Sequence, residues 1–376
     1  MRLFLIAGEP SGDRLGAALM AGLRALVPEV QFAGVGGPLM QAEGLASLFP
    51  MTELSVMGIA EVAPKYFALK HRIAQAAAAA LAANPAALIT IDSPDFNLRV
   101  ARIVKQSRPD IRTIHYVAPS VWAWRPGRAA RMARVIDHVL ALLPFEPPYM
   151  TAAGMSCDFV GHPVVAEPLA GRAERQALRS GGGGPVILAL PGSRRGEVTR
   201  LAPVIGAVLG RVMAAHPQAQ VLLPTLAAVA DLVRERAADW PIAPRVIEDA
   251  ASKRAAFAAA DVALAASGTV SLELAANGVP MVIAYKLHPL SMALMQRMAL
   301  TDTVTLVNLV SQTRVVPEFI GRRCSADLIA PALLGLLDGP ARAAQMAAMA
   351  LTMQRLGQGG EAPGLRAARS VLGVIG

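Results

Sequence analysis

Short apolar runs alternate along the chain with longer stretches in which apolar residues recur at helical spacing. Continuous apolar runs joined by helical crossovers are typical of parallel strands in sheets that helices cover on both faces. We predict six strands in the first half of the chain, at residues 3–7, 30–34, 88–91, 113–117, 138–143 and 158–161. A glycine-rich link at residues 181–184 precedes six more, at residues 186–190, 220–223, 245–248, 262–265, 281–285 and 305–309. The pattern predicts an α/β fold of two doubly wound parallel-sheet domains that face each other.

The chain has 376 residues, which is long for a single hydrophobic core and favours two domains. We place the first domain at residues 1–165 and the second at residues 166–345. Residues 346–376 are predicted to be mostly helical. In this fold class the chain end usually crosses back, so we expect this segment to pack on an N-terminal domain, of its own chain or of a neighbour.

Composition narrows the class of protein. Two cysteines, Cys157 and Cys324, are too few for a disulfide framework or a metal cluster. The apolar run at the N-terminus is too short for a signal peptide, and no run of about 18 uncharged apolar residues predicts a membrane-spanning helix. We therefore expect a cytoplasmic protein that is soluble or at most bound to a membrane surface.

The net charge of +9 fits an anionic partner, and a genomic composition bias toward arginine is the alternative explanation. Nucleic acid is one candidate, but the chain has no zinc-ligand pattern and no basic platform interleaved with aromatic residues, so we expect no nucleic acid. Anionic lipid headgroups or phosphorylated substrates fit a basic cytosolic protein equally well.

The clearest candidate for binding such an anion lies at residues 189–197, where a predicted strand turns into a predicted helix through Gly192, Ser193 and Arg194. Backbone N–H groups at a helix start favour anions, and a guanidinium can grip a phosphate bidentately. No Gly-Lys-Ser/Thr follows, so the turn is not a Walker loop. An ordinary turn with a solvated arginine is the alternative.

A second strand-end loop carries Ser267, Gly268 and Thr269, with Glu273 four residues beyond. Ser267 or Thr269 can cap the following helix, and Gly268 lets a ligand approach the backbone. A carboxylate is a poor phosphate ligand but a good acceptor for ribose hydroxyls. Together with Asn308 in the last predicted strand, the two loops predict a site for a nucleoside diphosphate.

In the first half, the loop after the first predicted strand carries Ser11, Gly12 and Asp13. It lacks G-x-G-x-x-G, which disfavours a nicotinamide cofactor. Ser11 and Asp13 are reasonable helix N-caps, and this structural role alone would explain them. We expect Gly12 to lie where a substrate approaches the backbone.

Two carboxylates, Asp92 and Asp95, follow the third predicted strand. Asp92 is nearest the strand, where burial can place it as a general base, and Asp95 could cap the next helix. The two residues lie three apart with no nearby His or Glu to complete a coordination shell, so we expect no metal.

The loop after the fourth predicted strand is rich in aromatic rings. Trp122 is suited to pack against the face of a sugar, although a role in the core is equally consistent with its sequence context. Arg125, Arg128, Arg131 and Arg134 recur at a spacing of three and spiral around a helix, which favours a solvated basic surface.

The segment at residues 51–74 mixes apolar and basic residues, as a surface that meets lipid does. The alternative is an amphipathic helix with its apolar face in the core. The residues that we assign to membrane or acyl-chain contact are Val56, Met57, Tyr66, Phe67, Lys70 and Arg72.

These motifs together resemble the lipid-A-disaccharide synthases, inverting glycosyltransferases of the two-domain GT-B class. The resemblance runs in order from residue 3 to about residue 325. The matching stretches are Gly8-Glu-Pro-Ser-Gly-Asp13, residues 36–44, residues 56–62, Ile91-Asp-Ser-Pro-Asp-Phe-Asn97, residues 115–124, Leu142-Leu-Pro-Phe-Glu146, Phe159-Val-Gly-His162, Leu190-Pro-Gly-Ser-Arg194 and Ser267-Gly-Thr269.

The resemblance implies transfer of 2,3-diacylglucosamine from its UDP derivative to 2,3-diacylglucosamine 1-phosphate (lipid X), giving a β-1′,6-linked disaccharide and UDP. It implies Asp92 as the base for the acceptor 6-hydroxyl, presented across a cleft from Arg194, which would meet the diphosphate. Loops bearing Ser11–Asp13, Asp95 and Trp122 would hold the acceptor. No cofactor or metal is implied; the inner-membrane surface is an expected partner, and a homodimer stays open.

Two other functions fit parts of the pattern. Another GT-B enzyme that uses UDP-N-acetylglucosamine, such as a transferase or an epimerase, would share the two-domain plan. A basic nucleotide-sensing protein on nucleic acid or membrane would not need Asp92, and its binding would weaken steeply with salt.

Overall fold

The computed structural model describes residues 1–54, 59–179, 183–288, 292, 295 and 297–376. The chain forms two compact units, one made of Met1–Ala166 with Gly359–Gly376 and the other of Glu167–Gln358. Each unit has its own six-stranded sheet, and all the strand pairs are parallel. The predicted α/β class with two parallel sheets is confirmed.

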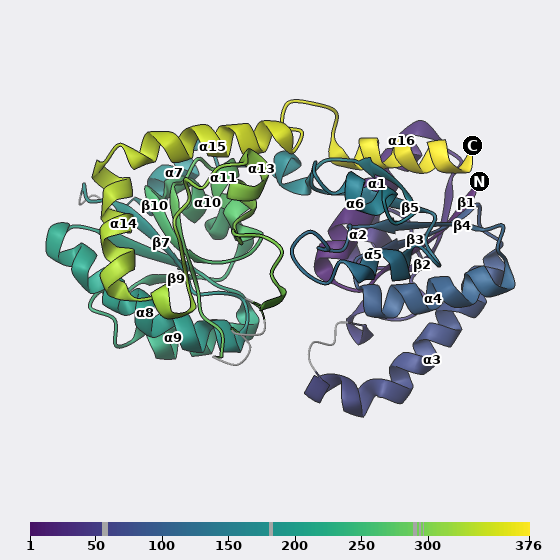
Figure 1. Cartoon of the computed structure of the whole chain (residues 1–376), viewed down its shortest axis with the longest axis horizontal. Coiled ribbons are helices and arrows are strands. Elements are labelled where there is room, and N and C mark those ends of the chain that lie inside the picture. The colour runs from purple at the N-terminus through teal and green to yellow at the C-terminus, as the bar shows by residue number, and fades with distance from the viewer. Residues whose placement is uncertain (55–58, 180–182, 289–291, 293–294, 296) are drawn as a thin grey trace. The chain divides into compact units, whose positions relative to one another are not determined.

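The sheet of the first unit has the order β2-β1-β3-β4-β5-β6. Its strands are β1 (Arg2–Ala7), β2 (Gln31–Val35), β3 (Ala87–Ile91), β4 (Arg112–Tyr116), β5 (His138–Ala141) and β6 (Ser156–Phe159). Every residue of the central strand β3 is buried, which explains why its sequence is apolar without alternation. The helices around this sheet are α1 (Pro10–Leu26), α2 (Pro38–Ala42), α3 (Ile59–Ala83), α4 (Pro94–Ser107), α5 (Gly127–Met132), α6 (Pro147–Thr151) and α16 (Pro363–Ile375) (Figure 1).

The sheet of the second unit has the order β12-β11-β10-β7-β8-β9. Its strands are β7 (Val186–Leu190), β8 (Gln220–Pro224), β9 (Arg245–Ile247), β10 (Val262–Ala266), β11 (Met281–Tyr285) and β12 (Glu318–Ile320). The helices of this unit include α7 (Arg172–Leu178), α8 (Arg195–Ala215), α9 (Ala230–Ala237), α10 (Ala250–Ala259), α11 (Val270–Ala276), α13 (Leu306–Ser311), α14 (Ala326–Asp338) and α15 (Ala341–Arg355). Short 3-10 turns lie at Met51–Glu53 and Pro163–Ala166 in the first unit, and at Ala227–Val229 and Gly321–Arg323 in the second.

The last predicted strand, at residues 305–309, is wrong. This stretch forms α13, and the strand that completes the sheet is β12, which was not predicted. A short apolar run fits a buried strand or a buried helix equally well. The helix fits better because the buried residues Val307, Asn308, Val310 and Ser311 share one helical face. The other predicted strands agree with the structure within two residues at each end.

Helix α8 is the one helix in the described part of the chain that is long and apolar enough to cross a membrane by length and composition. Its apolar face, which includes Val198, Leu201 and Leu209, belongs to the hydrophobic core of the second unit. Membrane-spanning and core helices pass the same test, and here the apolar face is covered by protein.

The end of the chain returns to the first unit later than the predicted boundary at residue 346. Gln345 on α15 is fully buried, and its side-chain amide bonds both the N–H and the C=O of Met281 at the start of β11. This clamp keeps α15 with the second unit. Only α16 packs on the first unit, against α1 of the same chain.

Two glycines allow α16 to approach α1 closely. A Cβ on Gly364 would lie 2.4 Å from the carbonyl oxygen of Ala18, and a Cβ on Gly22 would lie 2.6 Å from the carbonyl oxygen of Gly364. Helix α16 is also tied to the sheet, because the His138 ring on β5 bonds the Ser370 hydroxyl of α16 at 2.8 Å. Backbone therefore meets backbone along this interface.

We predict that Gly364→Ala lowers the free energy of unfolding by about 1–3 kcal/mol, because the new methyl group overpacks a rigid backbone contact. Gly373→Ala in the same helix is the matched control. Its Cβ would meet nothing within 4 Å, so the helix propensity of alanine should raise stability by about 0.5–1 kcal/mol. Urea unfolding measures both variants; equal effects would show that α16 is not docked on α1.

Candidate active site

Three strand-end loops of the second unit line a pocket of about 520 Å³. β10, β7 and β8 are neighbours in a parallel sheet, so their carboxyl ends meet at one edge. The loops that follow them contribute residues 192–194, 224–226 and 267–269, while α10 adds Lys253 and Phe257 and α11 adds Glu273. Ligands of doubly wound sheets bind at such an edge.

The loop after β7 is folded around the carboxylate of Glu197. One oxygen of this group accepts the N–H groups of Ser193 and Arg194 at 3.1 and 3.3 Å, and the other accepts Arg194 Nη1 at 3.2 Å. Gly192 has φ +114°, and a Cβ there would lie 2.6 Å from Glu197. The predicted residues Gly192, Ser193 and Arg194 therefore form one turn around the Glu197 carboxylate. The positive φ and the close approach of Glu197 require glycine at position 192.

Sequence reasoning missed Glu197, although a signal was present. A glutamate three residues after the residue that begins a helix is the pattern of a capping box, in which its side chain turns back to the backbone before the helix. Glu197 follows Arg194, the N-cap residue of α8, at this spacing. The carboxylate is thus held at the site where an anion was expected.

The four charged groups of the pocket form two ion pairs. Arg194 Nη1 lies 3.2 Å from Glu197, and Lys253 Nζ lies 2.8 Å from Glu273. Lys253 also lies 5.3 Å from the centre of the Phe257 ring. The predicted ribose acceptor Glu273 therefore faces the pocket together with a lysine that the sequence analysis did not identify, and the formal charges of the lining cancel.

The loop after β10 places Ser267, Gly268 and Thr269 on the pocket wall. Gly268 has φ +152°, a conformation that other residues rarely adopt. Neither predicted cap forms: the Ser267 hydroxyl donates to the Val304 carbonyl at 3.4 Å, and Thr269 occupies the N-cap position without a side-chain bond.

The loop after β8 gives the pocket an apolar end. Leu226 is 52% exposed and lines the pocket together with Pro224 and the Phe257 ring. Thr225 lies between Pro224 and Leu226, and its hydroxyl is buried with no hydrogen-bond partner among the described residues. The polar loop after β7 and this apolar end give the pocket two chemically different halves.

Asn308 is close to this edge of the sheet but does not line the pocket. It lies on α13, with a side chain 1% exposed. Its amide donates to the Val316 carbonyl at 2.9 Å and accepts the Val316 N–H at 3.0 Å. The structure thus places Asn308 behind the site, joining α13 to the segment before β12.

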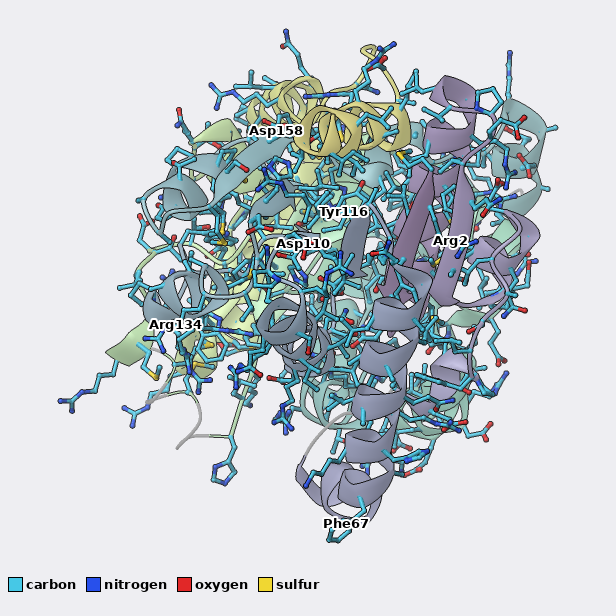
Figure 2. All side chains as sticks on the ribbon, turned by 90° about the vertical axis from the view of Figure 1, so that its right-hand side faces the viewer. Arg2, Phe67, Asp110, Tyr116, Arg134 and Asp158 are labelled. Carbon is cyan, nitrogen blue, oxygen red and sulfur yellow. The ribbon has the colours of Figure 1, made fainter. Side chains whose placement is uncertain are left out.

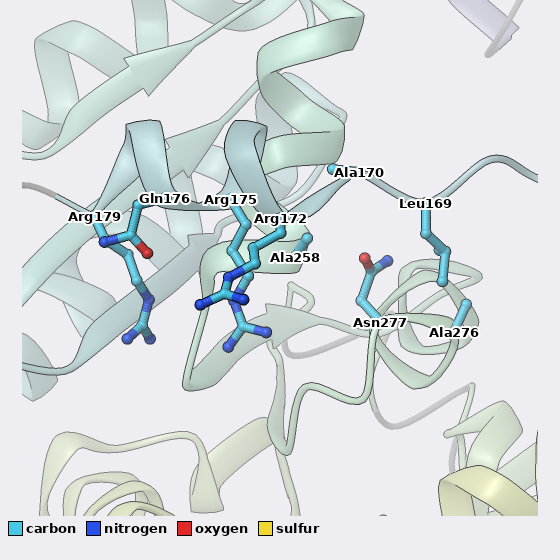
Figure 3. A pocket seen from close by; sticks show the side chains of 9 residues that line it. All are labelled: Leu169, Ala170, Arg172, Arg175, Gln176, Arg179, Ala258, Ala276 and Asn277. Carbon is cyan, nitrogen blue, oxygen red and sulfur yellow. The ribbon is translucent and has the colours of Figure 1, made fainter.

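A second hollow of about 550 Å³ lies on the same unit, beside α7. Figure 3 shows the guanidinium groups of Arg172, Arg175 and Arg179 pointing to one side of this helix. The hollow is also lined by Ala258 and Asn277, which lie at the carboxyl ends of α10 and α11. Helix C-termini favour cations, which accounts for the arginines without a ligand.

In the first unit, Asp92 lies directly after β3 in a backbone conformation that non-glycine residues rarely adopt. Asp92 has φ +51° and Ser93 φ +43°, and Val117, after the neighbouring strand β4, has φ +88°. Such strain of about 1–3 kcal/mol per residue is concentrated at functional sites. The half-buried Asp92 carboxylate accepts its neighbour's N–H (Ser93) at 2.9 Å.

Buried polar and small residues hold the Asp92 loop in this shape. Asn97 donates to the carbonyl oxygens of Ile91 and Asp92 at 3.1 and 2.7 Å. A Cβ on Gly8 would lie 2.5 Å from the Ser93 hydroxyl, and one on Gly12 would lie 3.4 Å from the Ile91 carbonyl oxygen. The loops after β1 and β3 are therefore in contact, which brings Gly12 beside the Asp92 loop.

The two other residues predicted in the first loop have different surroundings. Ser11 is exposed. Asp13 is 3% exposed, and its carboxylate accepts three N–H groups, from Gly37, Leu39 and Met40, at 2.9–3.0 Å. The alternative role of Ser11 and Asp13 as N-caps does not apply, because the N-cap residue is Glu9 and α1 begins at Pro10, a favoured first helical residue.

Trp122 is held in place by the loop after β5. Its indole N–H donates to Glu146 Oε1 at 3.3 Å, and its ring meets the Phe145 ring edge-on with centroids 5.2 Å apart. Glu146 is 4% exposed, and burial raises the pKa of its carboxyl group to about 7.

Asp95 is exposed in the first turn of α4 and, contrary to prediction, makes no capping bond.

Most of the expected lipid-contact segment lies on α3. Val56 and Met57 fall outside the described residues, as does the side chain of Tyr66. Phe67, in the first half of α3, is 81% exposed (Figure 2), and Lys70 is exposed nearby. Arg72 instead pairs with Glu53 at 2.8 Å and lies over the Phe49 ring.

Over the part of the chain that the structure describes, no group of three or more His, Cys, Asp or Glu side chains is arranged to hold a metal ion.

Comparison with known proteins identifies the family. The family model described as lipid-A-disaccharide synthetase matches residues 3–363. A lipid-A-disaccharide synthase of Ruegeria pomeroyi is 64% identical, with 99% of this chain and 95% of that protein covered. One of Rhodospirillum centenum is 48% identical, with 99% and 94% covered.

Solved structures with low sequence identity share the fold. A UDP-GlcNAc 2-epimerase from Neisseria meningitidis has a TM-score of 0.68 at 12% identity, covering 100% of this chain and 99% of that one. A glycosyltransferase from Rickettsia africae has a TM-score of 0.61 at 12% identity, covering 100% and 97%. The fold is therefore the GT-B fold expected from the sequence. With a family match over nearly its whole length, this chain belongs to the lipid-A-disaccharide synthases, glycosyltransferases of lipid A biosynthesis.

Proposed function

We propose that this protein joins UDP-2,3-diacylglucosamine to 2,3-diacylglucosamine 1-phosphate, with Asp92 as the base and the pocket of the second unit as the UDP site. The observation that carries this proposal is the pocket at the ends of β7, β8 and β10, because its two halves match the two ends of a nucleoside diphosphate. Family membership supports the choice of acylated sugars.

The diphosphate would bind at the loop after β7. Arg194 has a side chain that is 65% exposed, and the first turn of α8 presents N–H groups that have no acceptor within the helix. The uracil ring of UDP would bind at the apolar end, against Leu226 and Phe257. Glu273 would accept hydrogen bonds from the ribose hydroxyls. Ser267, Gly268 and Thr269 would line the path between them.

Asp92 is suited to deprotonate the acceptor. Its Oδ1 accepts the Ser93 N–H, while no described residue donates to Oδ2, which leaves this oxygen for a substrate hydroxyl. A base that removes the proton as the hydroxyl attacks the anomeric carbon gives inversion without a covalent enzyme intermediate. We infer that Ser11, Gly12, Asp95 and Trp122 contact the acceptor, and that Asp13 supports them by holding residues 37–40.

The leaving group determines what else the site must supply. Breaking the bond between sugar and diphosphate leaves negative charge on the diphosphate, which Arg194 and the N-terminus of α8 can stabilise. We therefore propose that transfer needs no metal ion or other cofactor. Asn308 would act indirectly, by fixing the segment behind the pocket.

The acylated substrates point to a membrane surface. We infer that α3 carries the contact, because Phe67 and Lys70 present an exposed ring and an exposed ammonium group on one short stretch. The location that follows is the cytoplasmic face of the inner membrane. A homodimer is compatible with this arrangement.

We predict that Asp92→Asn lowers the rate of UDP release about 10²–10⁴-fold, because the amide cannot accept a proton. Binding of UDP should be unchanged, since Asp92 does not line the pocket. Asp110→Asn, an exposed aspartate of the same unit that pairs with Arg108, is the control and should keep full activity. Undiminished turnover in Asp92→Asn would rule out Asp92 as the base.

Arg194→Gln should lower kcat about 10²–10³-fold, because one preorganised donor to the leaving group is lost. Arg195→Gln removes the same charge one residue later, from an exposed side chain that does not line the pocket. Steady-state kinetics on both variants separate the two cases: equal losses would mean that general charge, not the geometry of Arg194, is important.

The double variant Phe67→Ser/Lys70→Gln should bind anionic vesicles several-fold more weakly than the unmodified protein, since it loses both an apolar and an electrostatic contact. Co-sedimentation with phosphatidylglycerol vesicles measures this. Leu328→Ser, which changes an exposed leucine on α14 of the other unit, is the control. Equal binding by all three proteins would exclude α3 as the membrane contact.

A further inference from the structure

The loop proposed to bind the diphosphate is already engaged by a carboxylate of the protein itself. Glu197 Oε2 accepts the N–H groups of Ser193 and Arg194, and Oε1 accepts the Arg194 guanidinium. These are the groups that phosphate oxygens would use. A phosphate oxygen that took both N–H groups would have to displace Glu197.

The burial of Glu197 and the backbone conformation of the loop both favour the contact between the Glu197 carboxylate and residues 193–194. The Glu197 side chain is 11% exposed, whereas the Arg194 side chain that it pairs with is 65% exposed. The φ of +114° at Gly192 and the 2.6 Å that would separate a Cβ there from Glu197 mean that the backbone is shaped to admit the carboxylate. The acid is thus positioned by the fold, and the arginine is accessible.

The rest of the pocket does not offset this negative charge. Lys253, the other cation of the lining, is paired with Glu273 at 2.8 Å. A diphosphate therefore enters a pocket whose formal charges cancel, and its negative charge meets Glu197 at a short distance. Like charges brought together at close range cost free energy, and the cost is larger where solvent is excluded.

We propose that Glu197 is a built-in competitor of the diphosphate: its carboxylate holds the loop after β7 and must yield Ser193, Arg194 or both to the nucleotide. This inference rests on the proposed UDP site. It gives Glu197 a defined role, which is to weaken binding of UDP and so to help the product leave. Glu197 is a positioning residue of the loop, because the chemistry at the sugar does not involve it.

Glu197→Gln tests the proposal. The amide oxygen can still accept the loop N–H groups, so the loop is retained, but the negative charge and the ion pair with Arg194 are lost. The amide no longer repels the diphosphate and no longer holds the Arg194 guanidinium as an ion pair, so UDP should bind about 3- to 10-fold more tightly. Product inhibition by UDP should strengthen by the same factor.

The control variant is Glu235→Gln on α9, which removes the same charge from an exposed glutamate outside the pocket and should leave UDP affinity unchanged. Uridine is the control ligand: it has no phosphate, so its binding should be equal in the unmodified protein and in Glu197→Gln. Isothermal titration with UDP and competition by uridine give both values.

A double-mutant cycle with Arg194→Gln keeps the test informative if the single variant is less stable. When Arg194 is absent, Glu197→Gln should improve UDP binding less, because part of its benefit is the release of that guanidinium. A benefit of the same size in both backgrounds would contradict the exchange.

The outcomes separate the inference from the function on which it rests. If the unmodified protein does not bind UDP, the proposed nucleotide site is wrong. If it binds UDP and Glu197→Gln binds with equal or lower affinity, the proposed site survives and Glu197 is only a cap of α8, which overturns the competition.

Discussion

The candidate site depends on one constraint: in each unit the strands are parallel, so all of them end at the same edge of the sheet. Every loop that follows a strand therefore lies at that edge, even when the loops are far apart in the sequence. This brings residues 192–194, 224–226 and 267–269 to one pocket in the second unit, and brings Gly8 against Ser93 in the first. The central strands β3, β7 and β10 are buried along their whole length.

Several residues at these edges have strained backbone conformations that ordinary turns do not need. Asp92, Ser93 and Val117 have positive φ values, and Gly192 and Gly268 have φ values that only glycine adopts readily. Hydrogen bonds between buried polar side chains and the backbone stabilise the loops at these edges. Asn97, Asp13 and Glu197 each satisfy two or more backbone groups. The catalytic candidates and the residues that hold them are therefore different residues.

The sequence predicted the sheets well because the central strands are continuous apolar runs between turns; residues 186–190 and 281–285 were predicted residue for residue. The prediction failed at residues 305–309, because a short apolar run fits a buried strand and the buried face of a helix equally well, and this run forms α13. The positions of Asp92 and Arg194 in loops that follow β3 and β7 were predictable, because each residue comes shortly after a continuous apolar run. Lys253, Phe257 and Thr225 were not, because only the fold brings α10 and the loop after β8 to the loop after β7.

We propose a single displacement in which UDP leaves from the second unit while a base on the first unit activates the acceptor hydroxyl. The most direct test supplies purified protein with UDP-2,3-diacylglucosamine and 2,3-diacylglucosamine 1-phosphate in detergent with EDTA. UDP release and the configuration of the new glycosidic bond are then measured by NMR. The account predicts sustained UDP release and a β linkage. An α linkage, or no turnover by a folded protein that binds UDP, would contradict it.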